Sequence, residues 1–125
     1  MIKMRYGSQL GGPPAGVKID LLWTNQSPGT SFAAQTVVLD LAGYDFVMVL
    51  AATGTTAVNA ETFIALVDDG ASYNIFLRNY NTSTQYNYLR RFTVDNSGVT
   101  FASGLRDTTE NNNYAIPQKI FGIKL

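Results

Sequence analysis

The chain has 125 residues, enough for one domain with its own core, and it contains neither cysteine nor histidine. Disulfides, thiol nucleophiles and zinc–thiolate sites are therefore excluded, and so are catalytic triads that need histidine. Nine basic residues balance nine acidic ones, so the chain lacks the surplus of basic residues that would indicate a nucleic-acid partner. The longest apolar stretch, Phe46 to Ala52, is too short to span a membrane, and the N-terminus lacks the apolar core of a signal peptide.

Residues 1–16 are predicted to form a flexible N-terminal arm, because the run Gly11-Gly12-Pro13-Pro14 cannot be helical and suits a strand poorly. The ordered domain is expected to cover residues 17–125. Its first predicted strand runs from Val17 to Thr24 and alternates in polarity. That alternation places four side chains on one face, which we expect to join the core: Val17, Ile19, Leu21 and Trp23.

The next two predicted strands run from Phe32 to Leu41 and from Tyr44 to Ala52. The second of these is apolar on both faces apart from Asp45, which is typical of a strand covered on both sides. Two arrangements fit: a central strand covered by a loop, or a strand whose outer face meets another subunit.

Two hairpins are predicted in the second half of the chain. Asp68-Asp69-Gly70 separates the strands 61–67 and 72–79 and is a strong hairpin signal. Asp95-Asn96-Ser97-Gly98 separates the strands 86–94 and 99–104 in the same way. A polar loop, residues 81–85, is expected to join the two pairs.

A long polar loop is predicted from Leu105 to Asn113, followed by a last strand from Tyr114 to Leu125. Pro117 indicates an edge position or a bulge near the start of that strand. No helical period is visible, and about eight short strands alternate with turns. The fold class is therefore all-β, and a single antiparallel β-sandwich of jelly-roll type is the preferred architecture.

Acidic residues offer two candidate sites, and each has an ordinary structural explanation. Asp68 and Asp69 resemble a calcium-ligand pair, but Asp is also common in turns, and no EF-hand spacing is present. Asp107 and Glu110 fit a small glycan hydrolase only if they face each other across a cleft. We favour the turn and the solvated loop, and we expect no enzyme activity, no metal and no cofactor.

Tyrosines are the better lead to a ligand. Tyr80, Tyr86 and Tyr88 bracket the loop NTSTQ, and a tyrosine ring can stack on the apolar face of a sugar while polar neighbours read its hydroxyls. Tyrosine is also an ordinary strand residue, so both interpretations stay open.

Arg90 and Arg91 are adjacent on a predicted strand, so their side chains must point to opposite faces. One of them therefore faces a covered surface, where a buried arginine needs a carboxylate or several carbonyl oxygens. The alternative is a subunit interface, since interfaces are rich in arginine. Both are candidate interface residues, and they favour assembly over catalysis.

Three segments carry a family resemblance: LLWTNQSPGTSFAAQTVVLDLAGYDFVMV, RRFTVDNSGVTFASG and NNNYAIPQKIFGIKL. They resemble small β-domains encoded among the tail genes of phages and prophages of Gram-positive bacteria. The resemblance implies a virion or tail component made in the bacterial cytoplasm, homo-oligomeric and preferably trimeric. It also implies receptor binding, with a cell-wall or surface glycan as the partner, or a purely structural self-assembling role without a ligand.

Overall fold

The computed structural model describes residues 16–56, 59–68, 70–80 and 85–125. These residues form nine strands, and they contain no helix that could cross a membrane. The strands are β1 Lys18–Thr24, β2 Gln35–Val38, β3 Phe46–Gly54, β4 Ala60–Leu66, β5 Ser72–Tyr80, β6 Gln85–Asp95, β7 Gly98–Arg106, β8 Thr109–Glu110 and β9 Tyr114–Lys124.

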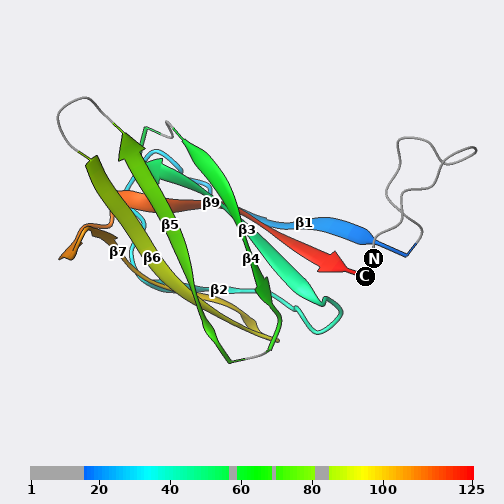
Figure 1. Ribbon diagram of the computed structural model, residues 1–125. Helices are drawn as coiled ribbons and strands as arrows, with labels where there is room; N and C mark the ends of the chain where they lie inside the picture. The colour runs from blue at the N-terminus through cyan, green and yellow to red at the C-terminus, as the bar shows by residue number, and fades with distance from the viewer. Residues whose placement is uncertain (1–15, 57–58, 69, 81–84) are drawn as a thin grey trace, which may run out of the picture.

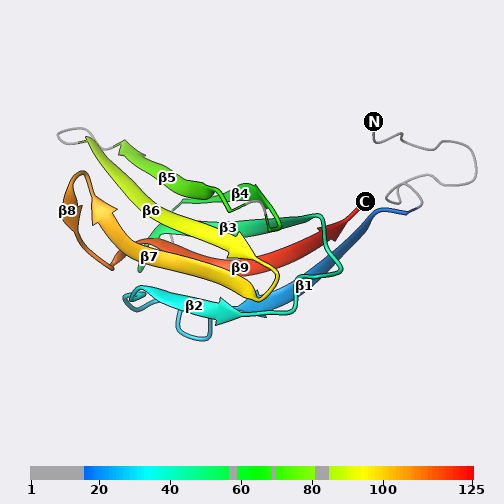
Figure 2. The same cartoon turned by 90° about the horizontal axis from the view of Figure 1, so that it is seen from below.

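The strands form two antiparallel sheets that pack face to face (Figures 1 and 2). Sheet A has the order β1-β9-β3-β4, and sheet B has the order β2-β7-β6-β5 with β8 paired to β7. The predicted all-β sandwich is therefore confirmed. The β3–β4 and β5–β6–β7–β8 connections stay within one sheet, whereas the chain changes sheet between β1, β2 and β3, between β4 and β5, and between β8 and β9. Jelly-roll connectivity stays a prediction.

One of the two predicted hairpins forms. β6 and β7 pair with Asp95 opposite Gly98, as expected. The hairpin predicted at Asp68-Asp69-Gly70 is wrong, because β4 belongs to sheet A and β5 to sheet B. Asp68 and Gly70 have φ angles of 61° and 72°, so the turn residues are used, but the turn carries the chain across the sandwich. Turn chemistry predicts a reversal of direction; pairing of the flanking strands depends on distant contacts.

The predicted loop 105–113 contains the end of one strand and a second, two-residue strand. β7 continues to Arg106, the chain turns at Asp107 with a φ of 55°, and β8 pairs back so that Glu110 lies opposite Leu105. The sequence does not predict this short hairpin, because both faces of its tip are exposed and its residues are therefore polar without alternation.

The last strand, β9, lies between β1 and β3 and is therefore central rather than at an edge. Its register with β3 shifts where Leu50 faces Lys119 and Ala51 faces Pro117. Of the two positions expected for Pro117, the bulge is the correct one. The bulge thus accommodates Pro117, which has no backbone N–H to donate, inside the sheet.

A second bulge lies in β1 and changes the face of its side chains. The register with β9 shifts between Leu21, which faces Phe121, and Trp23, which faces Ile120. Trp23 packs against the core, but Ile19 and Leu21 point away from it and are 56% and 52% exposed. The expectation that these residues share a core face is wrong, because the extra residue of a bulge breaks the two-residue period.

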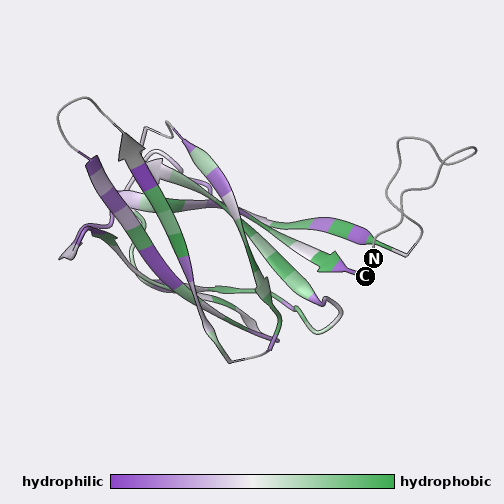
Figure 3. Ribbon diagram, in the orientation of Figure 1, coloured by the Kyte–Doolittle hydropathy of each residue, from purple (hydrophilic) through white to green (hydrophobic). Residues whose placement is uncertain are grey.

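The core lies between the sheets and is built from alternate residues of the central strands. Figure 3 shows this alternation as green and purple bands along β5 and β6. β3 is central in sheet A; its inward side chains are buried, and its outward ones are half-buried. The buried set includes Val47, Val49, Ala51, Ile75, Leu77, Phe92, Val94, Val99, Phe101, Ile116 and Ile120.

Candidate functional site

A pocket of about 290 Å³ opens at one end of the sandwich. It lies where β3 ends and β9 begins, with Gly54 paired opposite Tyr114. The described residues that line it are Thr53, Gly54, Thr55, Thr56, Asn59, Tyr88, Asn113 and Tyr114. The walls therefore come from the end of β3, the segment that follows it, and two tyrosines from the facing side.

The two tyrosines form one aromatic wall. The rings of Tyr88 and Tyr114 stack with centroids 4.3 Å apart and planes 7° from parallel. Gly54 makes this wall accessible, because a Cβ atom there would come within 3.3 Å of the Tyr114 ring. Tyr88 is almost fully buried, and Tyr114 is the more exposed of the two.

The remainder of the wall is polar and carries no charged side chain among the described residues. The Thr53 hydroxyl donates a hydrogen bond to the Asn59 carbonyl oxygen at 3.1 Å, and the Thr53 backbone N–H donates to the same oxygen at 2.8 Å. These bonds fix the rim on the β3 side. A ring face beside threonine and asparagine groups suits a neutral ligand that has an apolar face and hydroxyl groups.

Arg90 lies behind the aromatic wall and holds its backbone in place. Its guanidinium donates to three carbonyl oxygens: Ala115 at 2.8 Å, Ala102 at 2.8 Å and Tyr114 at 3.1 Å. It also lies 5.2 Å from the centroid of the Phe32 ring. Burial lowers the pKa of Arg90 to about 10. The backbone of Ala115 is strained, with a φ of 52°, and this conformation accompanies the two adjacent carbonyl contacts.

The two adjacent arginines do point to opposite faces, as predicted. Arg90 is wholly covered by its own chain and uses carbonyl oxygens rather than a carboxylate, whereas Arg91 is exposed. The covered position leaves no surface of Arg90 for a partner, so its candidacy as an interface residue does not hold. For Arg91 the interface role stays a prediction.

The three tyrosines singled out in the sequence have different surroundings, although the Tyr86 and Tyr88 rings lie 6.3 Å apart. Tyr88 lines the pocket. Tyr86 is half-buried beneath the Arg106 guanidinium, 4.6 Å from it, and does not line the pocket. The side chain of Tyr80 and residues 81–84 lie outside the described part of the chain. Sequence reasoning missed Tyr114, because only the pairing of β9 with β3 brings it to this end of the sandwich.

The candidate acidic residues do not reach the pocket. The Asp107 carboxylate accepts a hydrogen bond from the Asn87 backbone N–H at 3.1 Å, and Glu110 is exposed on β8. Asp68 lies in its turn, while Asp69 is outside the described residues. In the ranges that the structure describes, no group of three or more potential metal ligands occurs.

No protein-family model matches this chain, and a search among curated proteins finds no match either. The resemblance to β-domains of phage tail genes therefore stays a prediction.

Proposed function

We propose that this chain is a non-enzymatic interaction module of a phage or prophage tail, and that it binds a neutral host-surface carbohydrate in the pocket beside Tyr114. The tail context comes from the resemblance carried by the three sequence segments described above. The ligand class comes from one observation: an aromatic wall faces threonine and asparagine groups in a pocket whose described lining has no charge.

The size and chemistry of the pocket support a sugar. Its volume of about 290 Å³ lies at the lower end of the usual range for ligand pockets, roughly 300–1,000 Å³, and suits a single ring. The Tyr114 ring provides the apolar contact, and Asn113, Thr55 and Thr56 provide hydrogen-bond groups for hydroxyls. An anionic or cationic ligand would find no opposite charge on these residues.

The same lining argues for binding rather than hydrolysis. Glycoside hydrolysis requires two carboxyl groups placed on either side of the bond that breaks. None of the described residues that line the pocket is acidic, and Asp107 and Glu110 lie elsewhere. A binding role therefore explains the pocket without requiring a pair of carboxyl groups.

The position of the pocket also supports an interaction module. Tyr114 begins β9, and the far end of that strand pairs with the start of β1, where Lys124 lies opposite Lys18 (Figure 1). The pocket and the ends of the described chain thus lie at opposite ends of an 11-residue strand, about 35 Å apart. A domain joined to a larger particle through its chain ends would present the pocket outward.

Binding to cell-wall polysaccharides or to an array of neutral glycans tests the proposal. Tyr114→Ala is expected to weaken any binding about tenfold or more, because it removes the apolar contact with the ring. Tyr86→Ala is the matched control, since Tyr86 lies outside the pocket, and it should leave binding unchanged. Circular dichroism checks that both variants fold.

Two results would contradict this assignment. The first is the absence of binding to every neutral glycan and to host cells. The second is loss of binding in Tyr86→Ala but not in Tyr114→Ala, which would move the site to the segment around residues 80–86.

A second function, structural self-assembly without a ligand, is favoured by a different observation. The outer face of sheet A carries an apolar surface that the described residues leave partly exposed.

A further inference from the structure

The outer face of sheet A carries two complete rows of apolar side chains. Residues paired across antiparallel strands share a face, so the register between strands defines the rows. The first row crosses all four strands, and so does the second. The first row consists of Ile19, Ile123, Phe46 and Leu66. The second row consists of Leu21, Phe121, Met48 and Ile64.

The third row is mixed and closes the surface on one side. It contains Thr24, Lys119, Leu50 and Thr62, so Lys119 is the one charged side chain among the twelve positions. The residues at the two edges of the apolar rows are the most exposed: Ile19 56%, Leu21 52%, Ile64 57% and Leu66 46%. We call the twelve residues of these three rows the apolar face.

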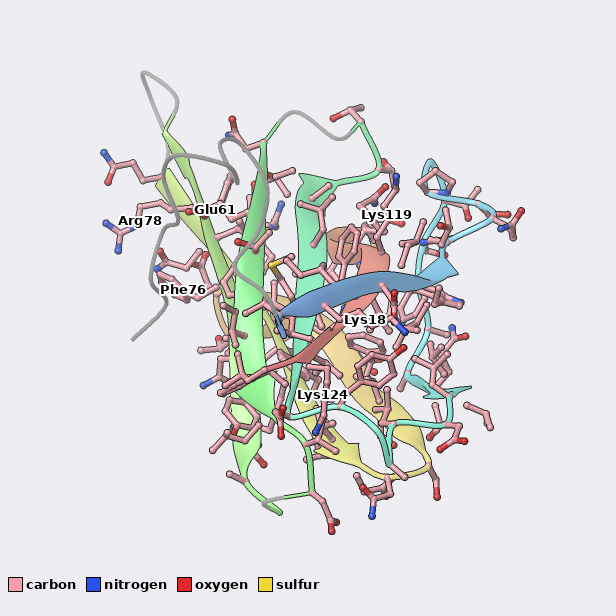
Figure 4. All side chains as sticks on the ribbon, turned by 90° about the vertical axis from the view of Figure 1, so that its right-hand side faces the viewer. Lys18, Glu61, Phe76, Arg78, Lys119 and Lys124 are labelled. Carbon is pink, nitrogen blue, oxygen red and sulfur yellow. The ribbon has the colours of Figure 1, made fainter. Side chains whose placement is uncertain are left out.

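Sheet B differs from sheet A on its outer side. One row across it consists of Thr36, Thr100, Thr93 and Ser72, and the Thr36 and Thr100 hydroxyls are hydrogen-bonded at 2.9 Å. The exposed Phe76 lies near Arg78 on β5, away from the lysines of β1 and β9 (Figure 4). A second row of sheet B consists of Phe76, Leu89 and Leu105 and ends at Glu110, so sheet B has one apolar row where sheet A has two. Since antiparallel sandwiches commonly have polar outer faces, sheet A departs further from the pattern.

We propose that the apolar face binds a second copy of this chain, with the two faces packed against each other about a two-fold axis. A surface that is apolar along two rows can pack against an identical surface, and a two-fold interface requires such a match. The formal net charge of the chain is zero, and Lys119 is the one charged side chain of the apolar face, so charge repulsion between two copies is small.

The size of the face suits such an interface. Four strands about 4.8 Å apart and three rows about 6.7 Å apart span roughly 400 Å² before side-chain relief is counted. A standard protein interface covers about 800 Å² of accessible surface on each partner. The apolar face would therefore form the interface core, and the residues around it would supply the remainder.

This inference names a partner for the interaction module and to that extent rests on the proposed function. It selects a dimer over the trimer that the family resemblance implies. It does not involve the pocket, which lies at the end of the sandwich, so the two proposals can fail independently. Glycan-binding measurements test the proposed function, and the molecular mass in solution tests the dimer.

Light scattering of the full chain between micromolar and hundred-micromolar concentrations tests the inference. The expected mass is twice the 13.6 kDa of one chain. Ile64→Lys and Leu21→Lys, at opposite edges of the apolar face, should each raise the dissociation constant about a hundredfold or more, because each buries a charge in the interface. Both side chains are exposed in the monomer, so the fold should be retained, as circular dichroism can verify.

Val38→Lys is the matched control. Val38 is an equally apolar residue, 81% exposed, on β2 of sheet B, and the same change there should leave the mass unchanged. A monomer, a trimer, or a dimer that survives both sheet A substitutions would overturn the inference. A monomer would mean that another protein or residues 1–15 of this chain cover the face instead.

Discussion

Arg90 is a buried cation surrounded by carbonyl oxygens. Its three acceptors come from Ala102 on β7 and from Tyr114 and Ala115 at the start of β9, so one side chain ties both sheets together behind the pocket. Gly104 makes room for it, because a Cβ atom at that position would come within 2.8 Å of the guanidinium. The lowered pKa shows that burial disfavours the charge, and the three hydrogen bonds offset this cost.

Replacing Arg90 by methionine is expected to lower the free energy of unfolding by about 3 kcal/mol or more, since three buried carbonyl groups lose their donors. Urea denaturation measures the change. Arg91→Met is the matched control, because the neighbouring arginine is exposed, and its effect should stay within about 0.5 kcal/mol. Similar losses in both variants would refute this role for the buried guanidinium.

Tyr44 forms another polar contact that contributes to stability. Its hydroxyl donates to the Asp20 carboxylate at 2.6 Å, and its ring lies over Gly122, where a Cβ atom would come within 2.7 Å of it. The hydrogen bond to Asp20, followed by burial and by the charges of Asp20 and Asp40, raises the pKa of Tyr44 above its usual 10. The neutral phenol is therefore favoured in the folded state.

The stability contributed by this hydrogen bond should depend on pH in a defined direction. A raised folded-state pKa means that the contribution is fully present below the unfolded tyrosine pKa, near 10, and is lost as the pH rises through the folded-state pKa. Tyr44→Phe should consequently destabilise the protein at pH 8 and have a smaller effect near pH 11, as measured by denaturation of both proteins at each pH. An effect that grows with pH would show that the hydrogen bond does not control this titration.

At the scale of the element, β2 is short and depends on a single glycine. Gly98 begins β7 opposite Val38 with a φ of 149°, a conformation that other residues rarely adopt. A Cβ atom there would overlap the Val37 carbonyl oxygen and lie 3.1 Å from the Leu39 nitrogen. The close approach of β2 to the β6–β7 hairpin therefore requires glycine.

Gly98→Ala is expected to cost about 2 kcal/mol or more, because it combines backbone strain with a clash against β2. Thermal denaturation gives the magnitude, and hydrogen exchange at Val37 and Val38 reports whether β2 separates from the sheet. Gly43→Ala is the control, since nothing lies within 4 Å of an added Cβ atom there. Unchanged protection of β2 in Gly98→Ala would contradict the proposed contact.

The bulge in β1 has the largest consequence of any single element. With a regular strand, Ile19, Leu21 and Trp23 would share one face. The register shift after Leu21 sends Trp23 toward Phe32 in the core and leaves Ile19 and Leu21 on the outer side. One extra residue in an edge strand therefore directs Trp23 into the core while Ile19 and Leu21 stay on the outer side.

At the scale of the whole molecule, the two sheets and the two ends differ in character. The outer face of sheet A has two apolar rows and that of sheet B carries a threonine row, while the pocket and the ends of the described chain lie at opposite ends of β9. The proposed ligand pocket, the proposed dimer face and the ends of the described chain therefore lie in three different regions. The composition alone, with few charges and many asparagines and threonines, indicates none of these positions.

The sequence by itself determined the all-β class, most strand positions, the 95–98 hairpin, the opposite faces of Arg90 and Arg91, and the absence of histidine and cysteine chemistry. These follow from local rules, because alternation and turn residues act over a few neighbours. Only the tertiary structure decided the β4–β5 crossover, the outward face of Ile19 and Leu21, the partners of Arg90 and the meeting of Tyr88 with Tyr114. Each of these depends on register or packing between segments far apart in the chain, and no local pattern encodes that pairing.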